Sequence, residues 1–397
     1  MKMSDSANAP SIGLGRFNDE FLESLRQEGD EPADRAVRVF FEAADAPGSA
    51  LYPMLARAAG APLTDEEAPG VGPFVRMKEP WPSWTEPTLV TRGQDLFGDW
   101  GMQLASGLFL ASLPMSYACA KGAEPLVRTA RMTKSPKRRI LETGQMIIEV
   151  MSPRSLEPGA RGYAVARHVR VMHAAVRHTL TDPEAMETIG GAAMPAWDES
   201  LGVPLNQEDL LGTLLAFSVL GVRSLRQVGV KLSDLDAESY VHTWNLVGHQ
   251  MGIREDLLPL NYADGAVVAD RIFKSQSERS EAGRELTATT IGAMQELLKT
   301  KLLAGLPASG IRFFLGEDTA DLLGVPPGNW TRSLFSAMRH VDAPIDKMLS
   351  WLPGKHSLSS AIGRRVVTGL EDVERGHGRP RFEITDELRQ AWGIKAP

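Results

Sequence analysis

The segment from Arg161 to Leu180, RGYAVARHVRVMHAAVRHTL, decides how the chain folds. Apolar side chains recur in it at the spacing of an α-helix, so they share one face. That face carries five residues, at offsets of 3, 4, 7 and 11 from the first: Val169, Met172, His173, Val176 and Leu180. The pair Asp182-Pro183 ends the pattern, because proline cannot continue a helix. The segment therefore predicts a buried helix with a histidine on its apolar face.

The same helical periodicity runs through most of the chain. Three further segments predict helices that carry polar residues of interest: 137–151, 206–222 and 236–251. The last two begin with acidic residues, which the positive end of a helix dipole favours, and Asn206 is placed to cap the helix that it begins. Strand-like alternation bounded by turns is scarce. We therefore predict an all-α fold.

Composition and helix-breaking residues divide the chain into three parts. Residues 1–30 are small and polar and predict a loose arm; an amphipathic helix over 34–44 follows, with Asp34 placed as its cap. The proline-rich stretch 79–87 cannot lie inside a helix, so it predicts a connector. We expect an N-terminal arm and helical extension over 1–88, a large helical core over 89–351, and a C-terminal extension over 352–397.

The composition excludes several classes of protein. Cys119 is the one cysteine among 397 residues, which rules out an internal disulfide, a zinc finger and an iron–sulfur cluster. A bound iron would have to be held by histidine, carboxylate, tyrosine or methionine, and the sequence has eight histidines. A net charge of −7 argues against nucleic acid as a partner.

The sequence predicts no membrane span and shows no export signal. Gln103 and Pro114 interrupt its most apolar stretch, residues 101–120, which favours a buried core helix over a span of about 20 residues. The first 18 residues lack the basic and apolar regions of a signal peptide. We expect a cytoplasmic protein, or a secreted one whose signal peptide has been removed, and a monomer or weak oligomer.

His173 admits two interpretations. An imidazole in an apolar wall costs free energy unless its nitrogens are satisfied. A haem iron bound to Nε2 would satisfy one of them, with Arg170 and Arg177 as partners for the haem propionates. An ordinary core histidine, hydrogen-bonded to a backbone carbonyl group, is the other interpretation. The pattern by itself favours the core histidine.

The segment 137–151 places a polar group above an apolar strip. Arg139, Glu142 and Thr143 share one face, and apolar residues continue that face toward the end of the segment. Such a face can hold a small polar ligand, such as dioxygen, beside a hydrocarbon. The alternative is a surface Arg–Glu pair, which contributes only about 0.3 kcal/mol.

His242 and His249 lie on one face of the segment 236–251. They are two helical turns apart, about 10.5 Å, which is too far for both to bind one metal ion. We expect each to be a core residue or to support the site without binding the metal directly. The sequence has no P-loop, nucleophile elbow or dinucleotide-binding fingerprint.

Taken in order, these segments resemble a known family. The resemblance rests on Arg139-x-x-Glu142-Thr143-Gly144, Arg170-x-x-His173-x-x-x-Arg177, Gly202-x-Pro-x-Asn-Gln-Glu-Asp209, and then His242 and His249. They look like the latex-clearing proteins, which are haem b rubber oxygenases. The wider group includes the fungal oxygenase that cleaves a prenyl side chain in mycophenolic acid biosynthesis. The similarity covers roughly residues 90–350.

The resemblance implies a globin-like helical core with additional N- and C-terminal helices, holding one haem b. It implies that His173 is the proximal iron ligand, with Arg170 in its immediate surroundings. It also implies that Arg139 and Thr143 lie on the distal side, where they would polarise dioxygen.

Two carboxylates have expected roles in this resemblance. Characterised rubber oxygenases have a lysine that can occupy the distal iron site where this chain has Glu142, so the charge of the pocket differs. The family's distal glutamate, its proposed base, is matched most nearly by Glu124. Either carboxylate would remove an allylic proton or assist rearrangement of the oxygen–oxygen bond.

The expected function is a haem b-dependent dioxygenase. It would use O2 to cleave C=C bonds of polyisoprene-like or other apolar alkene substrates, giving a ketone and an aldehyde. A haem peroxidase or monooxygenase on a smaller apolar substrate is the alternative, which Glu142 favours. A non-catalytic haem-binding protein is a third possibility, although the sequence shows no sensory partner domain.

Overall fold

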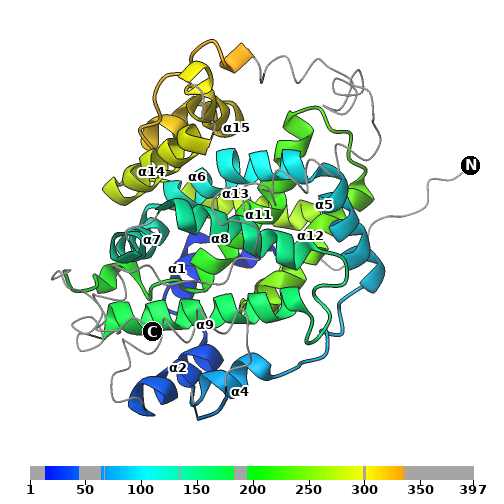
Figure 1. Cartoon of the computed structure of the whole chain (residues 1–397), viewed down its shortest axis with the longest axis vertical. Helices are drawn as coiled ribbons and strands as arrows, with labels where there is room; N and C mark the ends of the chain where they lie inside the picture. The colour runs from blue at the N-terminus through cyan, green and yellow to red at the C-terminus, as the bar shows by residue number, and fades with distance from the viewer. Residues whose placement is uncertain are drawn as a thin grey trace, which may run out of the picture.

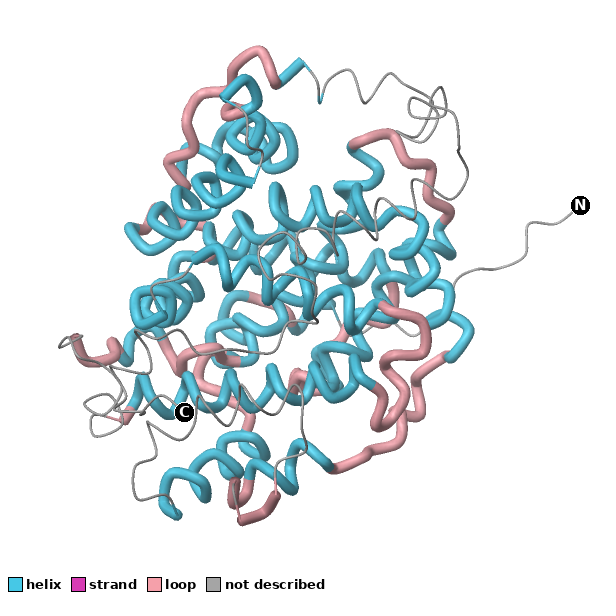
Figure 2. The backbone as a smooth tube through the Cα atoms, viewed as in Figure 1, coloured by secondary structure: helices cyan, strands magenta, loops and turns pink. Residues whose placement is uncertain are grey.

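The computed structural model describes residues 14–43, 64–66, 68–133, 136–182, 195–297, 301–333 and 335. Over these residues the chain folds into packed helices without a β-strand, apart from one isolated bridge between Cys119 and Ser277 (Figure 2). The prediction of an all-α fold is confirmed. The expected C-terminal extension, 352–397, lies outside the described residues.

The α-helices are α1 (Asp19–Leu25), α2 (Glu31–Ala43), α4 (Val71–Arg76), α5 (Pro87–Gly107), α6 (Leu113–Ala118), α7 (Ala120–Thr133), α8 (Pro136–Met151), α9 (Arg161–Thr181), α11 (Gln207–Gln227), α12 (Asp234–Gln250), α13 (Tyr262–Gln276), α14 (Glu281–Leu297) and α15 (Leu306–Leu322). A π-helix, η2 (Leu108–Ser112), joins α5 to α6. Short 3₁₀ turns are η1 (Leu14–Arg16), η3 (Glu199–Leu201), η4 (Glu255–Leu257) and η5 (Lys301–Leu303). The four helices predicted with polar residues of interest are α8, α9, α11 and α12.

α11 lies at the centre of the fold. It is buried over most of its length and packs against α5, α12 and α13. Asn206 caps it as predicted, because its side-chain oxygen accepts the N–H of Asp209 at 2.9 Å. The helix continues to Gln227, five residues beyond the predicted end at 222.

α9 separates the main core from a smaller apolar cluster (Figure 1). On one face Val171, Ala174 and Ala175 pack in the cluster formed with α2 and α4. At about 100° per residue, His173 points about 160° away from Val171, toward the side where α8 packs. α9 is therefore apolar on two sides, and its histidine belongs to the side of the main core.

The N-terminal arm, defined here as residues 14–43, is docked rather than loose. It buries three apolar side chains in the main core: Phe17, Leu22 and Leu25. α2 begins three residues before Asp34, whose Oδ2 accepts the N–H of Asp30 at 3.0 Å and closes the first turn. The prediction of a loose arm over 1–30 is wrong for residues 14–30. The sequence could not show this, since partners such as Leu201 and Glu208 lie more than a hundred residues away in the chain.

The apolar stretch 101–120 forms the end of α5, the π-helix η2 and α6. Pro114 lies in the first turn of α6 and has no N–H to donate, so the hydrogen-bonding pattern changes beside it. Within the described part of the chain, no helix combines the length and the apolarity that a membrane crossing requires. Residues 77–86 form the predicted connector, and Pro87 begins α5.

Candidate active site

The candidate site lies on the hairpin of α8 and α9, which pack side by side. Arg161 Nε forms an ion pair with Glu149 Oε2 at 2.5 Å where the hairpin closes. Gly162 allows the close approach, because a Cβ there would lie 2.6 Å from the Glu149 carbonyl oxygen. Since both helices rise equally per residue, counting ten residues from this contact places the backbone of Arg139 level with Val171 or Met172, within about 3 Å of the level of His173.

The imidazole of His173 is neutral and lacks a hydrogen bond at one nitrogen. Burial, and secondly the charge of Arg177, lower the pKa of His173 to about 3. The side chain is half-buried, and its Nδ1 is buried without a hydrogen-bond partner among the described residues. A core histidine whose Nδ1 is bonded to a backbone carbonyl group is therefore not what the structure has at this position.

The polar residues predicted on α8 lie on a helix that faces the main core. Glu142 and Thr143 are half-buried, whereas Ile147 and Val150 are buried in the core cluster. The predicted apolar wall below the polar group is thus present. The side chain of Arg139 lies outside the part of the chain whose side chains are described, although its backbone belongs to α8.

The two arginines that flank the candidate iron ligand are held by carboxylates of the N-terminal arm. Arg170 donates to Asp30 from Nε at 2.6 Å and from Nη2 at 2.8 Å. Arg177 Nε donates to Asp34 Oδ1 at 2.7 Å. The Asp30 side chain is only 2% exposed, so the ion pair between Arg170 and Asp30 is not a surface pair. The partnership of these arginines with haem propionates stays a prediction, because protein carboxylates already bind them here.

His242 and His249 are brought together by an indole ring. Both imidazoles pack edge-on against Trp84, at centroid distances of 5.6 and 6.2 Å. His242 Nε2 accepts the N–H of Glu86 at 2.9 Å and so helps to begin α5. Burial lowers the pKa of both histidines, and the charge of Arg170 contributes to the shift at His249. No pattern in the sequence indicated a role for Trp84, which lies in the connector.

Glu124 lies on α7, apart from the hairpin that carries the other predicted residues. Its Oε1 accepts the Nε–H of Arg128, one turn further on, at 2.8 Å. Arg128 also donates to the carbonyl oxygen of Pro195 at 2.8 Å, and its guanidinium lies over the Trp197 ring. α7 packs against α14 and touches α9. A role for Glu124 as a base stays a prediction.

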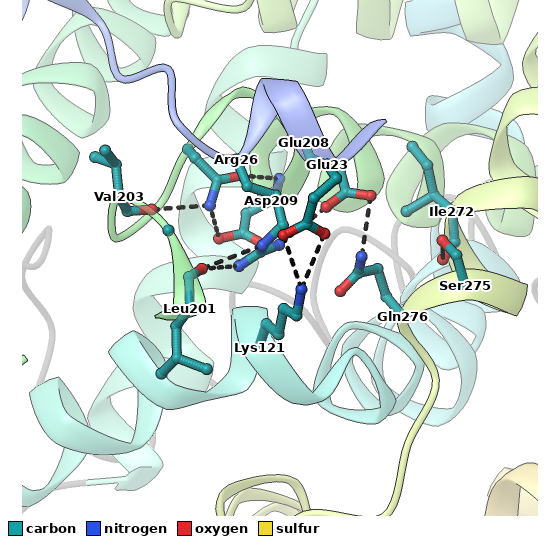
Figure 3. Close-up of polar contacts among 12 residues, drawn as sticks. Glu23, Arg26, Lys121, Leu201, Val203, Glu208, Asp209, Ile272, Ser275 and Gln276 are labelled. Atoms are coloured by element: carbon teal, nitrogen blue, oxygen red, sulfur yellow. Dashed lines mark hydrogen bonds and ion pairs between the residues drawn. The ribbon is translucent and has the colours of Figure 1, made fainter. Parts of the chain in front are cut away.

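A buried charged cluster beside α11 was not predicted (Figure 3). Arg26 is 1% exposed, and its Nη1 donates to Glu208 Oε2 and Asp209 Oδ1, both at 2.9 Å. Its Nε and Nη2 donate to the carbonyl oxygen of Leu201, at 3.1 and 2.6 Å. Burial raises the pKa of Glu208 to about 7. The sequence feature that could have indicated this cluster is the pair of adjacent acids, Glu208 and Asp209, in the first turn of α11. Acids in a first turn are ordinarily explained by the helix dipole.

The Gly-x-Pro-x-Asn-Gln-Glu-Asp element therefore holds the N-terminal arm. Gln207 Nε2 donates to the carbonyl oxygens of Gly29 at 2.8 Å and Gly252 at 3.0 Å, and its Oε1 accepts the N–H of Arg254 at 2.9 Å. The N–H of Val203 donates to the carbonyl oxygen of Arg26 at 2.8 Å. Side chains and backbone of this one element thus bind the arm beside α9.

Known proteins share these segments. Residues 95–343 match the family model described as "ER-bound oxygenase mpaB/B'/Rubber oxygenase, catalytic domain". A rubber oxygenase from Streptomyces sp. (strain K30) is 24% identical over 331 residues, which cover 81% of this chain and 75% of that protein. The solved structure of a latex-clearing protein in the closed state has a similar fold, with a TM-score of 0.66 and 20% identity, covering 91% of this chain and 95% of that one. Since the family match spans well over half of the sequence and includes α8, α9 and the arm-binding element, the chain belongs to the mpaB and rubber oxygenase family.

Proposed function

We propose that this protein is a haem b-dependent dioxygenase that cleaves C=C bonds of apolar, polyisoprene-like alkenes. His173 carries the proposal: it is a neutral imidazole on an apolar helix face, with a buried Nδ1 that lacks a hydrogen-bond partner among the described residues. Neutral imidazole is the form that binds iron. Membership of an oxygenase family supports the assignment of this histidine to a redox site.

The residues around His173 fit a haem. Haem iron in proteins is commonly held by one proximal histidine within an apolar pocket. Val169, Met172 and Val176 share the face of His173 and are only half-buried, although α8 packs beside α9. Accessible surface therefore remains for a flat apolar group next to the imidazole. His173 would bind the iron, and the side chains of this face would contact the ring.

Bound at this position, haem would supply the activation of dioxygen. The chain's own residues would orient the alkene and handle a proton. The buried Ile147 and Val150 provide an apolar wall that excludes water from the double bond. Thr143 offers a hydroxyl donor on the same helix, and the Glu142 carboxylate would accept an allylic proton and return it. The overall change, R₂C=CHR′ + O₂ giving R₂C=O and R′CHO, needs no external reductant.

Absorption spectra of the purified protein test haem binding. We expect a Soret band in the full chain and its loss in His173→Ala. His178→Ala is the matched control, because His178 lies five residues further along α9, packs against Phe41 and should leave the band unchanged. A wild-type protein that is expressed with a haem supply and shows no Soret band, or a His173→Ala variant with full haem content, would refute the proposal.

Isotope labelling tests the reaction. Incubation with polyisoprene oligomers under ¹⁸O₂ should give a ketone and an aldehyde that each carry one labelled oxygen atom. Turnover that requires peroxide would instead identify a peroxidase or monooxygenase, the alternative that Glu142 favours. Haem-loaded protein without product under either oxidant would indicate a haem-binding protein that is not an enzyme.

A further inference from the structure

We propose that Asp30 and Asp34 of the N-terminal arm are positioning residues of the oxygenase site. They hold the guanidinium groups of Arg170 and Arg177 beside His173 and balance their positive charges. The inference rests on the proposed function, since it is the haem site at His173 that these arginines would border.

Four residues form one continuous chain of hydrogen bonds along the edge of α9, in which the backbone N–H of Asp30 makes the link to Asp34. Asp30 accepts both the Nε–H and an Nη2–H of Arg170, at 2.6 and 2.8 Å. The N–H of Asp30 donates to Asp34 Oδ2 at 3.0 Å. Asp34 Oδ1 in turn accepts the Nε–H of Arg177 at 2.7 Å. Each carboxylate therefore holds one arginine, and the backbone of Asp30 joins the two ion pairs.

The two arginines flank the candidate iron ligand along the helix. Arg170 precedes His173 by three residues and Arg177 follows it by four, so both lie about one turn away. At about 100° per residue the arginines are about 20° apart around the axis, and His173 borders them. Their charges and orientations are thus part of the electrostatic environment of His173.

The backbone around these ion pairs leaves no room for another side chain. A Cβ at Gly252, where φ is +92°, would lie 2.1 Å from Asp30 Oδ2 and 2.8 Å from Arg170 Nε. A Cβ at Gly29 would lie 2.7 Å from Asp34 Oδ2. Gln207 binds the carbonyl oxygens of both glycines. The two pairs are therefore enclosed by the fold, unlike the exposed pairs of the surface.

Charge balance gives the positioning a chemical consequence. A buried positive charge that loses its counter-charge acts strongly on its surroundings, because the local dielectric constant is low. Next to an iron centre, it favours the reduced and less positive state of the metal. Neutralising Asp30 or Asp34 should therefore raise the iron reduction potential, besides releasing the guanidinium that the carboxylate holds.

The experiment compares Asp30→Asn and Asp34→Asn with a matched control, Glu28→Gln. Glu28 lies on the same arm and pairs with Arg254 at 2.5 Å, but both side chains are about 40% exposed and neither belongs to α9. Loss of this pair reports the effect of loosening the arm alone. Asp34 is less enclosed, with a side chain 21% exposed, so Asp34→Asn keeps the test decisive if Asp30→Asn folds poorly.

Two readouts are used on the full chain. The first is the arginine Nε–H NMR signal, measured without haem and assigned with Arg170→Lys and Arg177→Lys; carboxylate-bound Nε–H groups give protected, shifted signals. Asp30→Asn should shift the signal of Arg170 and Asp34→Asn that of Arg177, each with faster solvent exchange, while Glu28→Gln should leave both signals unchanged. The second is the reduction potential of the haem-loaded protein. It should rise in both Asn variants and stay at the wild-type value in Glu28→Gln.

Each result decides a separate claim. Unchanged arginine signals in both Asn variants would overturn the positioning role, whether or not haem binds. Shifted signals with an unchanged potential would overturn the charge-balancing role. Shifted signals in a protein that shows no Soret band would refute the proposed haem site while the positioning of the arginines stands.

Discussion

Replacing Arg26 by methionine should destabilise the protein strongly. Methionine retains much of the apolar stem but leaves Glu208, whose side chain is 1% exposed, and Asp209, 10% exposed, without their shared cation. Removing one partner of a buried ion pair costs about 3–5 kcal/mol, because the remaining charge is uncompensated. We expect a loss in this range at pH 8.5.

The loss should be smaller at pH 5. Burial raises the pKa of Glu208 from its ordinary 4.5 to about 7 in the folded protein. Because the folded pKa lies above the unfolded one, the protonated form of Glu208 stabilises the folded protein. This contribution is complete below pH 4.5 and is lost as the pH rises through about 7. The difference between the folded and unfolded pKa of Glu208 corresponds to about 3 kcal/mol of folding free energy. Arg26 lowers this pKa, so its removal raises the pKa further and makes stability fall more steeply with pH.

Guanidinium unfolding followed by tryptophan fluorescence at pH 5.0 and 8.5 measures both effects. The double variant Arg26→Met with Glu208→Gln should recover part of the stability lost at pH 8.5. One of the two carboxylates that would lack a cation is then replaced by a neutral amide. A loss below about 1 kcal/mol, or an equal loss at both pH values, would show that the cluster is not the buried charge centre described here.

Three further predictions concern local structure. Gly252→Ala should lower the free energy of unfolding, measured by thermal unfolding, by about 3 kcal/mol, since φ is positive there and the new methyl group would clash with Asp30. A loss under about 1 kcal/mol would show that the arm moves to accommodate the methyl group. Ser233→Ala removes the capping box of α12 and should cost about 1 kcal/mol by the same assay, and no loss would rule out that cap in solution. His242→Gln should make stability fall less steeply at acid pH. Burial lowers the pKa of His242, so the neutral ring that accepts the Glu86 N–H stabilises the fold above the unfolded pKa of histidine. This contribution is lost as the pH falls through the folded pKa of His242. An unchanged acid limb of the stability curve would contradict this.

The sequence predicted the helices of the candidate site well, because their boundaries are local. Ser152-Pro153 and Asp182-Pro183 stop α8 and α9 close to the predicted residues, and Asn206 begins α11 through its own side chain. The position of His173 on the same helix face as Met172 and Val176 likewise depends only on spacing along one helix. Periodicity contains this information without any knowledge of tertiary contacts.

The partners of the site's charged residues could not be predicted in the same way. Arg170 was expected to face haem propionates, yet it is bound by Asp30, 140 residues earlier. Arg26 lies in a segment that was expected to be loose, and its partner Glu208 follows it by 182 residues. Pairings over such distances are set by tertiary packing, which leaves no periodic trace in either segment. Their sequence signature is only an unusual placement of charge.

The docked arm also fixes an order of events during synthesis. Translation at about 5–20 residues per second separates the appearance of Arg26 from that of Glu208 by about 10–35 s. During that interval the arm is made but its partners Arg170, Glu208 and Arg254 are not yet all present. The arm therefore leaves the ribosome before its partners and docks only after they have been made. Closure of the edge of α9 therefore requires a nascent chain that extends at least to Arg254.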